Sequence, residues 1–176
     1  MSAELTTLDY KLYTTDEQIE TLSKLAETIW HECYSKILSN EQIEHMLTVE
    51  QSPESLKEQI QNGTSYYVIE IDHTPVGYYA YELRNDDALY GKEYIFISKM
   101  YLRADIRHKG LASLIMKQLR KYARKNGLEY FKLYVNRKNE HAISVYKHKG
   151  LRIISEIDRD LGNGFTAEDY IMGKMV

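Results

Sequence analysis

One stretch of the sequence decides the fold: residues 95–113 read IFISKMYLRADIRHKGLAS. Its apolar part predicts a strand over residues 93–102, and the periodicity that follows predicts a long helix over about residues 109–126. A short loop that leads from a strand into a helix leaves N–H groups of the first helical turn without partners, at the positive end of the helix dipole. Arg107 adds a full charge, and Gly110 lets the backbone approach a bulky anion. The segment therefore predicts a phosphate-binding site.

The charge distribution supports the same interpretation. Residues 99–125 hold nine Lys or Arg residues and one acid, Asp105, a net charge of +8. The whole chain carries −3, so the remainder carries −11. This imbalance favours a localised anionic ligand over a protein that coats nucleic acid, although an ordinary solvated basic helix is the alternative. The glycine spacing matches neither a dinucleotide-binding fingerprint nor a P-loop.

Length and composition bound the remaining possibilities. The 176 residues, with 43% hydrophobic and 28% charged residues, predict one globular domain over residues 1–176. Cys33 is the only cysteine, which excludes an intrachain disulfide and favours a reducing compartment. The start of the chain lacks the pattern of a signal peptide, and no apolar run is long enough to cross a bilayer. We expect a cytoplasmic protein with no membrane contact and, because its six histidines are dispersed, no metal.

The rest of the chain predicts alternating sheet and helix. Helices are expected over residues 15–35, from residue 39, and over residues 53–63 and 139–149, each with a capping residue, a first-turn proline or a terminal glycine. Further strands are expected over residues 5–13, 66–71, 76–83, 130–135, 153–158 and 170–175. This order predicts an α/β (mixed α+β) domain, with a mixed, mostly antiparallel sheet of about seven strands and helices on both faces.

A second motif follows the strand over residues 130–135. Asn139, Ala142, Tyr146 and Gly150 follow one another at spacings of three, four and four, which places the first three on one face of a helix that ends at the glycine. An ordinary buried stripe is the alternative. Tyrosine is abundant, with 16 residues. Among those in predicted strands, we expect six to supply core and cleft walls: Tyr66, Tyr67, Tyr78, Tyr79, Tyr81 and Tyr94.

Together the two motifs carry a resemblance to a known family. A strand, an Arg-x-x-Gly-x-Ala loop, a helix, a strand that ends in Val-Asn and the pattern Asn-x-x-Ala-x-x-x-Tyr-x-x-x-Gly resemble the acyl-CoA-binding core of the GNAT superfamily of N-acetyltransferases, over about residues 95–151. Outside this core, the helical pair after the first strand, the start of a helix at residues 52–54 and the closing strand at residues 169–172 resemble the bacterial spermidine/spermine-type branch.

The resemblance implies direct acetyl transfer from acetyl-CoA to a primary amine. It implies that backbone groups of Met100, Tyr101 and Leu102 pair with the pantetheine arm, with the Tyr101 N–H polarising the carbonyl. The pyrophosphate is expected at Arg107, His108, Lys109, Gly110, Leu111, Ala112 and Ser113. Asn139 would contact the cofactor near its thioester arm, and Tyr146 would protonate the departing thiolate.

The resemblance leaves the general base open. Many relatives have an acidic residue where Ser98 stands here, and serine does not accept a proton at neutral pH. Candidates are a water chain to bulk and four side chains: Glu93, Glu82, Glu32 and His31. The first long helix walls the acceptor site by resemblance, so we expect His31 and Glu32, which lie on it, to contact the substrate. Glu82, from a predicted strand, is a further substrate-binding candidate. An acidic acceptor wall is expected from Glu27, Glu32, Glu41, Glu44, Asp86 and Asp87.

Several functions remain open from the sequence. A small amine such as a polyamine is the favoured acceptor, because the chain outside the basic segment is acidic. The rival enzyme acetylates protein amino termini or lysines. Rivals from other classes are a CoA-binding protein without catalysis, which the Ser98 departure allows, and a nucleic-acid-binding module, which would need a helix and turn where a strand is predicted. A homodimer is possible through an exposed strand edge.

Overall fold

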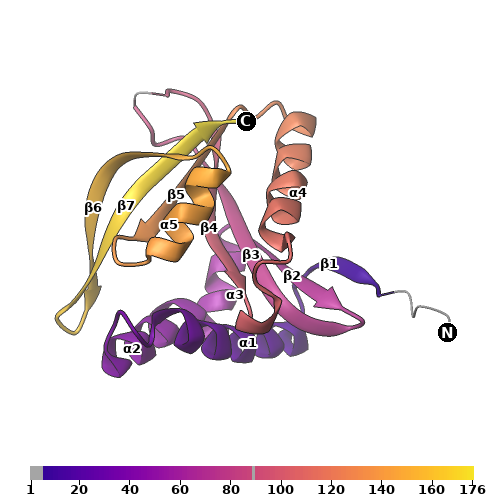
Figure 1. Ribbon diagram of the computed structural model, residues 1–176, viewed down its shortest axis with the longest axis vertical. Coiled ribbons are helices and arrows are strands. Elements are labelled where there is room, and N and C mark those ends of the chain that lie inside the picture. Colours follow the sequence, from indigo (N-terminus) through magenta and orange to yellow (C-terminus); the bar gives the residue numbers. More distant parts are fainter. Residues whose placement is uncertain (1–5, 89) are drawn as a thin grey trace.

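The computed structural model describes residues 6–88 and 90–176 and contains a seven-stranded sheet with the order β1-β2-β3-β4-β5-β7-β6 (Figure 1). The strands are β1 (Leu8–Leu12), β2 (Ser65–Ile71), β3 (Thr74–Arg84), β4 (Tyr94–Leu102), β5 (Tyr130–Asn136), β6 (Arg152–Gly162) and β7 (Phe165–Met175). The helices are α1 (Asp16–Tyr34), α2 (Asn40–Gln51), α3 (Pro53–Gln61), α4 (Leu111–Lys125) and α5 (Glu140–His148), with a 3₁₀ turn, η1 (Ala104–Ile106), before α4. The mixed, mostly antiparallel sheet confirms the predicted fold class.

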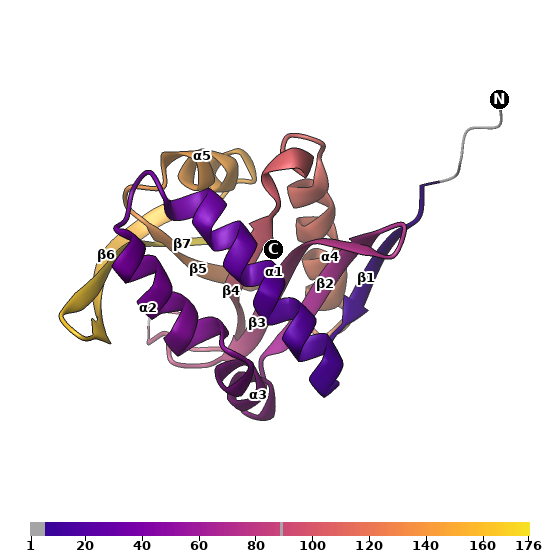
Figure 2. The ribbon, with the colours of Figure 1, turned by 90° about the horizontal axis from the view of Figure 1, so that it is seen from below.

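Helices cover both faces of the sheet, as predicted. Figure 2 shows α1, α2 and α3 on one face, with α4 and α5 on the other. The first layer buries Leu22, Ile29 and Trp30 of α1 against Tyr78 and other side chains of β2 and β3. The second layer buries the apolar stripe of α4 against the opposite side of the same strands and of β5. Burial on both faces explains why the central strands are almost continuously apolar.

Local signals in the sequence start the helices where expected. Thr15 and Gln18 form a reciprocal capping box at α1, and the Ser39 hydroxyl accepts from the Gln42 N–H at α2. The Ser52 hydroxyl caps α3, with Pro53 in its first turn. In contrast, α4 begins at Gly110 with no side-chain cap. This helix start has the free N–H groups that an anion would need.

The sheet opens between β4 and β5. These parallel strands pair only from Ile95 to Ile97, whereas β4 stays paired with β3 as far as Leu102. The register of β4 against β3 shifts at one point, where Lys99 pairs with Ala80 but Ile97 pairs with Tyr81. Ser98 is therefore the extra residue of a β-bulge, at the place where β4 leaves β5. The bulge in β4 and the separation of β4 from β5 together create a gap within the sheet.

The carboxyl-terminal strands differ most from prediction. The last two strands, β6 and β7, are longer than the expected 153–158 and 170–175, and β7 lies between β5 and β6. Within the described residues, no helix has the length and apolar character that a membrane span requires. The expectations about the start of the chain, including the first residue of the strand over 5–13, fall on residues 1–5, outside the described residues.

The six strand tyrosines expected to wall both core and cleft contribute to the core and do not line the cavity. Tyr66 and Tyr78 are fully buried, and the Tyr78 hydroxyl receives a hydrogen bond from Trp30 and donates one to Gln51. Tyr67 stacks between Tyr79 and Tyr81 on the other face. The predicted core role is confirmed, but the cavity described below is lined by tyrosines from other positions. These are Tyr34, Tyr101, Tyr134 and Tyr146.

Candidate active site

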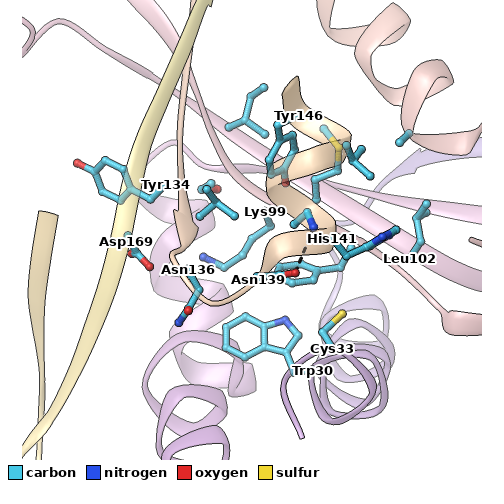
Figure 3. A pocket seen from close by; sticks show the side chains of 18 of the residues that line it. Trp30, Cys33, Lys99, Leu102, Tyr134, Asn136, Asn139, His141, Tyr146 and Asp169 are labelled. Atoms are coloured by element: carbon cyan, nitrogen blue, oxygen red, sulfur yellow. Dashed lines mark hydrogen bonds between the residues drawn. The ribbon is translucent and has the colours of Figure 1, made fainter. Parts of the chain in front are cut away.

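A cavity of about 990 Å³ occupies the gap between β4 and β5. Both sequence motifs line it: residues 96–102 and the loop before α4 on one side, and Asn139 and Tyr146 on the other. Figure 3 shows Tyr146 of α5 and Asn139, the residue just before α5, facing Trp30 and Cys33 of α1 across the pocket, with Asp169 on the side away from Leu102. Two segments separated by about 40 residues therefore meet at one site, as their resemblance to a single motif implies.

The register of β4 determines which N–H groups face the gap. The Arg103 N–H donates to the Val76 carbonyl of β3 at 2.9 Å. Successive N–H groups of a strand point to opposite sides, and the pairing is regular from Lys99 onward, so the Tyr101 N–H also faces β3. The N–H groups of Met100 and Leu102 face the gap instead. This corrects the expectation that the Tyr101 N–H polarises the thioester.

The side chain of Tyr101 packs among aromatic side chains of α1 and β3. Its ring lies 5.4 Å from the Trp30 ring and 5.5 Å from the Tyr78 ring, and its hydroxyl is 2.8 Å from the Tyr34 hydroxyl. Burial raises the pKa of Tyr101 well above its usual value, so the phenol stays neutral. Tyr101 thus joins the sheet to α1 beneath the cavity.

The loop before α4 presents its backbone to the cavity. Gly110 has φ of +83°, a left-handed conformation that favours glycine, and a Cβ added there would meet no atom within 4 Å. Gly110, Leu111, Ala112 and Ser113 line the cavity at the uncapped start of α4, together with His108. Lys109 is exposed to solvent beside this lining. Open space at the glycine and unpaired N–H groups fit a bulky anion such as a pyrophosphate.

Arg107 is tied into the protein. Its Nε donates to the Leu102 carbonyl oxygen at 3.0 Å, and one Nη lies 3.1 Å from the Cys33 sulfur and 3.7 Å from a Glu32 carboxylate oxygen. Burial raises the pKa of the Cys33 thiol, although the Arg107 charge opposes this shift. Arg107 therefore joins three elements: the end of β4, the loop and α1. Its guanidinium lines the cavity but is already engaged.

The second motif supplies one cap and one free hydroxyl. The Asn139 side chain accepts from the Ala142 N–H at 3.2 Å and so caps α5. Tyr146 is 9% exposed, packs its ring in the core and lines the cavity. Among the described residues its hydroxyl makes no hydrogen bond. Burial raises the pKa of Tyr146, with a smaller contribution from Cys33, so the group holds its proton at neutral pH.

Three ion pairs line the part of the cavity formed by α2, β3, β6 and β7. Lys99 contacts Glu50 at 3.1 Å, with side chains 12% and 21% exposed. Arg159 donates from two nitrogens to one oxygen of Asp169, and Arg84 pairs with Glu82. Burial lowers the pKa of Lys99, but Glu50 outweighs it and the net shift is upward. Burial raises the pKa of Asp169 despite the Arg159 charge.

The structure brings Glu82 to the cavity but not the other acids expected to wall it. His31 pairs with Glu44 at 2.6 Å on the outer side of α1 and α2, and Glu32 accepts from the Ala104 N–H at 2.8 Å. Glu93 is exposed just before β4. The carboxylates of the described lining are Glu50, Glu82 and Asp169 in place of the predicted set: Glu27, Glu32, Glu41, Glu44, Asp86 and Asp87. His31, Glu32 and Glu93 therefore leave the list of candidates for the base.

Sequence reasoning did not find several residues of the site. Lys99 and Glu50 are 49 positions apart, and neither spacing nor local pattern connects α2 with β4. Ser98 lines the cavity, and its hydroxyl is buried without a hydrogen-bond partner among the described residues. Of the nine basic residues that suggested an anion site, four line a separate hollow on the outer side of α4: Lys117, Arg120, Lys121 and Arg124. Among the described residues, no group of three His, Cys, Asp or Glu side chains could hold a metal ion.

Comparison with known proteins places the chain among acetyltransferases. The model of the acetyltransferase (GNAT) family matches residues 23–151, which is more than half of the chain. A spermidine N(1)-acetyltransferase of Thermoplasma acidophilum is 26% identical over 142 residues, which cover 78% of this chain and 84% of the relative.

Solved structures share the fold over almost the whole chain. The PaiA N-acetyltransferase of Thermoplasma acidophilum in complex with coenzyme A superposes with a TM-score of 0.77 at 23% identity, covering 97% of this chain and 99% of that one. A GCN5-related N-acetyltransferase structure from Rhodopseudomonas palustris also reaches 0.77, at 14% identity, over 99% of this chain and 100% of the other. At these identities the likeness is one of fold.

Proposed function

The chain belongs to the acetyltransferase (GNAT) family, and from this premise we propose that it moves the acetyl group of acetyl-CoA to a primary amine of a small, polyamine-like molecule. The observation that carries the proposal is the gap between β4 and β5, which brings unpaired backbone N–H groups and the free Tyr146 hydroxyl into one cavity. The polyamine class is supported by the 26% identical relative, a spermidine acetyltransferase.

The residues present fit coenzyme A. Acetyl-CoA supplies an acetyl group activated as a thioester. The uncapped start of α4 and the open space at Gly110 would hold the pyrophosphate. The N–H groups of Met100 and Leu102, which face the gap between β4 and β5, would pair with the pantetheine arm. Asn139 caps α5 at the edge of the same cavity, which fits its expected contact near the thioester arm.

Two groups of this chain act on the charges that develop during transfer. Attack of a neutral amine on the carbonyl carbon places negative charge on the carbonyl oxygen, which the Met100 N–H is positioned by register to stabilise. As the carbon–sulfur bond breaks, the thiolate needs a proton. Tyr146 is neutral, has a free hydroxyl and lines the cavity, so we assign it as the donor.

The acceptor amine is assigned to the part of the cavity with the three ion pairs. A primary amine has a pKa near 10.4, so its ammonium must lose a proton before attack. Glu50, Glu82 and Asp169 are the carboxylates that face this region, and each is held by one cation. We propose that they bind the ammonium groups of the substrate and pass the released proton to water.

A thiol-release assay tests the proposal. Purified protein is incubated with acetyl-CoA and either spermidine, a small monoamine or a peptide with a free amino terminus and lysine. Fastest release of free thiol with spermidine, and an acetylated polyamine in the mass spectrum, is the expected result. Faster turnover of the peptide would move the assignment to protein acetylation. Binding of CoA without thiol release from any amine would leave a CoA-binding protein without catalysis. The homodimer stays a prediction.

A further inference from the structure

Two histidines meet at the phosphate end of the cavity. His108 stands in the loop before α4, and His141 lies in the first turn of α5. Their ring centroids are 5.1 Å apart with an interplanar angle of 67°, and both line the cavity. They therefore connect the two elements that flank the expected position of the pyrophosphate.

The charged groups around the pair are mostly basic. Arg107 neighbours His108 in the loop, and Lys149 at the end of α5 contacts the Ser113 hydroxyl of α4. Glu32 of α1 contacts Arg107 at 3.7 Å, and Glu140 precedes His141 in α5. Partial desolvation lowers the pKa of His141, and the His108 and Arg107 charges lower it further. Without a ligand the protonated form of His141 is thus disfavoured.

Arg107 leaves the phosphate end short of free cations. Its guanidinium is engaged with the Leu102 carbonyl and the Cys33 sulfur. Lys109 is exposed beside the lining, and Lys149 is engaged with Ser113. Since a pyrophosphate and a sugar phosphate carry several negative charges, Lys109 alone does not balance them, and the two imidazoles are the further groups that an anion would protonate.

We infer that the histidine pair, His108 and His141, is a phosphate-binding subsite that takes up protons when CoA binds, so that CoA binds more tightly as the pH falls. This rests on the proposed function, because the ligand is CoA. The sign follows from linkage: bound phosphate favours the charged imidazole, so the complex binds more protons than the free protein. The gain in affinity is complete where the free histidines are already protonated, and it is lost as the pH rises past the range in which the bound histidines keep their protons.

Calorimetric titration with CoA tests the inference without any turnover. The wild type and the double variant His108→Asn/His141→Gln are titrated near pH 6 and near pH 8, in two buffers that differ in ionisation enthalpy. Asparagine suits position 108 because the backbone there has φ of +63°. The control His73→Asn removes a histidine at φ of +66°, in the turn between β2 and β3.

When the pH is lowered from about 8 to about 6, the CoA affinity of the wild type and of His73→Asn should increase by a factor about fivefold larger than that of the double variant. Both should also take up more protons on binding CoA. The phosphates of free CoA titrate identically in every experiment, so a difference between the proteins reports on the bound site. Equal pH dependence and equal proton uptake would overturn the inference. If the double variant does not fold, His141→Gln alone serves, because this side chain is exposed. Absence of CoA binding by the wild type at both pH values would instead contradict the proposed function.

Discussion

The Nε of Arg107 donates to the carbonyl oxygen of Leu102 at 3.0 Å. This bond fixes the loop before α4 to the end of β4, at the part of the strand that no longer pairs with β5. Both parts of the cavity assigned to coenzyme A, the strand with its outward N–H groups and the start of α4, are therefore held in one geometry by a single side chain. The same guanidinium reaches Cys33 and so fixes α1 to this unit.

Arg107→Lys should weaken CoA binding about tenfold, since a lysine has no planar fork and leaves the Leu102 carbonyl without its charged donor. Calorimetric titration with CoA measures the change. Arg103→Lys is the control, because Arg103 pairs with Asp105 on the surface. Equal dissociation constants for the wild type and Arg107→Lys would contradict the role of this bond.

Glu50→Gln should destabilise the protein by about 3 kcal/mol, because it leaves the Lys99 ammonium, only 12% exposed, without its counter-charge. For a chain of this size that loss lowers Tm by roughly 6–12 °C. The surface pair Lys92 and Glu129, at 3.5 Å, provides the comparison: Glu129→Gln should leave Tm nearly unchanged. Similar melting temperatures for both variants would show that the buried pair stabilises the protein no more than the surface pair does.

Asp169→Asn should raise the KM for the amine about tenfold while the CoA dissociation constant stays the same, because the carboxylate lines the part of the cavity that we propose for the acceptor. Burial raises the pKa of Asp169, so the wild-type KM should also rise on acidification at a higher pH than an ordinary aspartate would give. Glu168→Gln, an exposed neighbour, is the control. An unchanged KM in Asp169→Asn would remove this residue from the acceptor site.

Glu70 should contribute stability that depends on acid pH. Burial raises the pKa of this carboxyl, but bonds from Lys11 at 2.5 Å and Tyr13 at 2.7 Å outweigh it and lower the pKa overall. A carboxyl with a lowered folded-state pKa stabilises above its unfolded pKa, about 4.3 for glutamate, and loses this contribution as the pH falls through the folded value.

Urea unfolding of the wild type and Glu70→Gln over a series of acid pH values measures this dependence. The wild type should be more stable at neutral pH, and the difference should shrink below about pH 4. Glu54→Gln, at an exposed site, should run parallel to the wild type throughout. If the difference in the free energy of unfolding between the wild type and Glu70→Gln stays constant with pH, the pairing of Glu70 is not its cause.

Local chemistry explains why much of the fold was predictable. Thr15, Ser39 and Ser52 cap helices through contacts three residues along the chain, and such contacts are visible in sequence. Asn139 marks the start of α5 for the same reason. The resemblance then joined the two motifs, which no local rule could do.

Long-range contacts explain what the sequence could not reveal. The pairing of Lys99 with Glu50 depends on how α2 crosses the sheet, and the pairing of Arg159 with Asp169 depends on the twist of the β6–β7 hairpin. The N–H direction at Tyr101 depends on one bulged residue, Ser98, because a shift of one position reverses which groups face a neighbour. The expected roles of Tyr101 and His31 changed for these reasons.

The proton donor is the most direct test of the account. Tyr146→Phe keeps the buried ring and removes only the hydroxyl, so the CoA dissociation constant should stay within about twofold while kcat for acetyl transfer falls about 10²-fold. Tyr134→Phe, another tyrosine of the cavity lining, is the matched control. The measurement is kcat by thiol release over the pH range, with CoA affinity determined alongside. Unchanged turnover of Tyr146→Phe at every pH would contradict the assignment of Tyr146 as the acid.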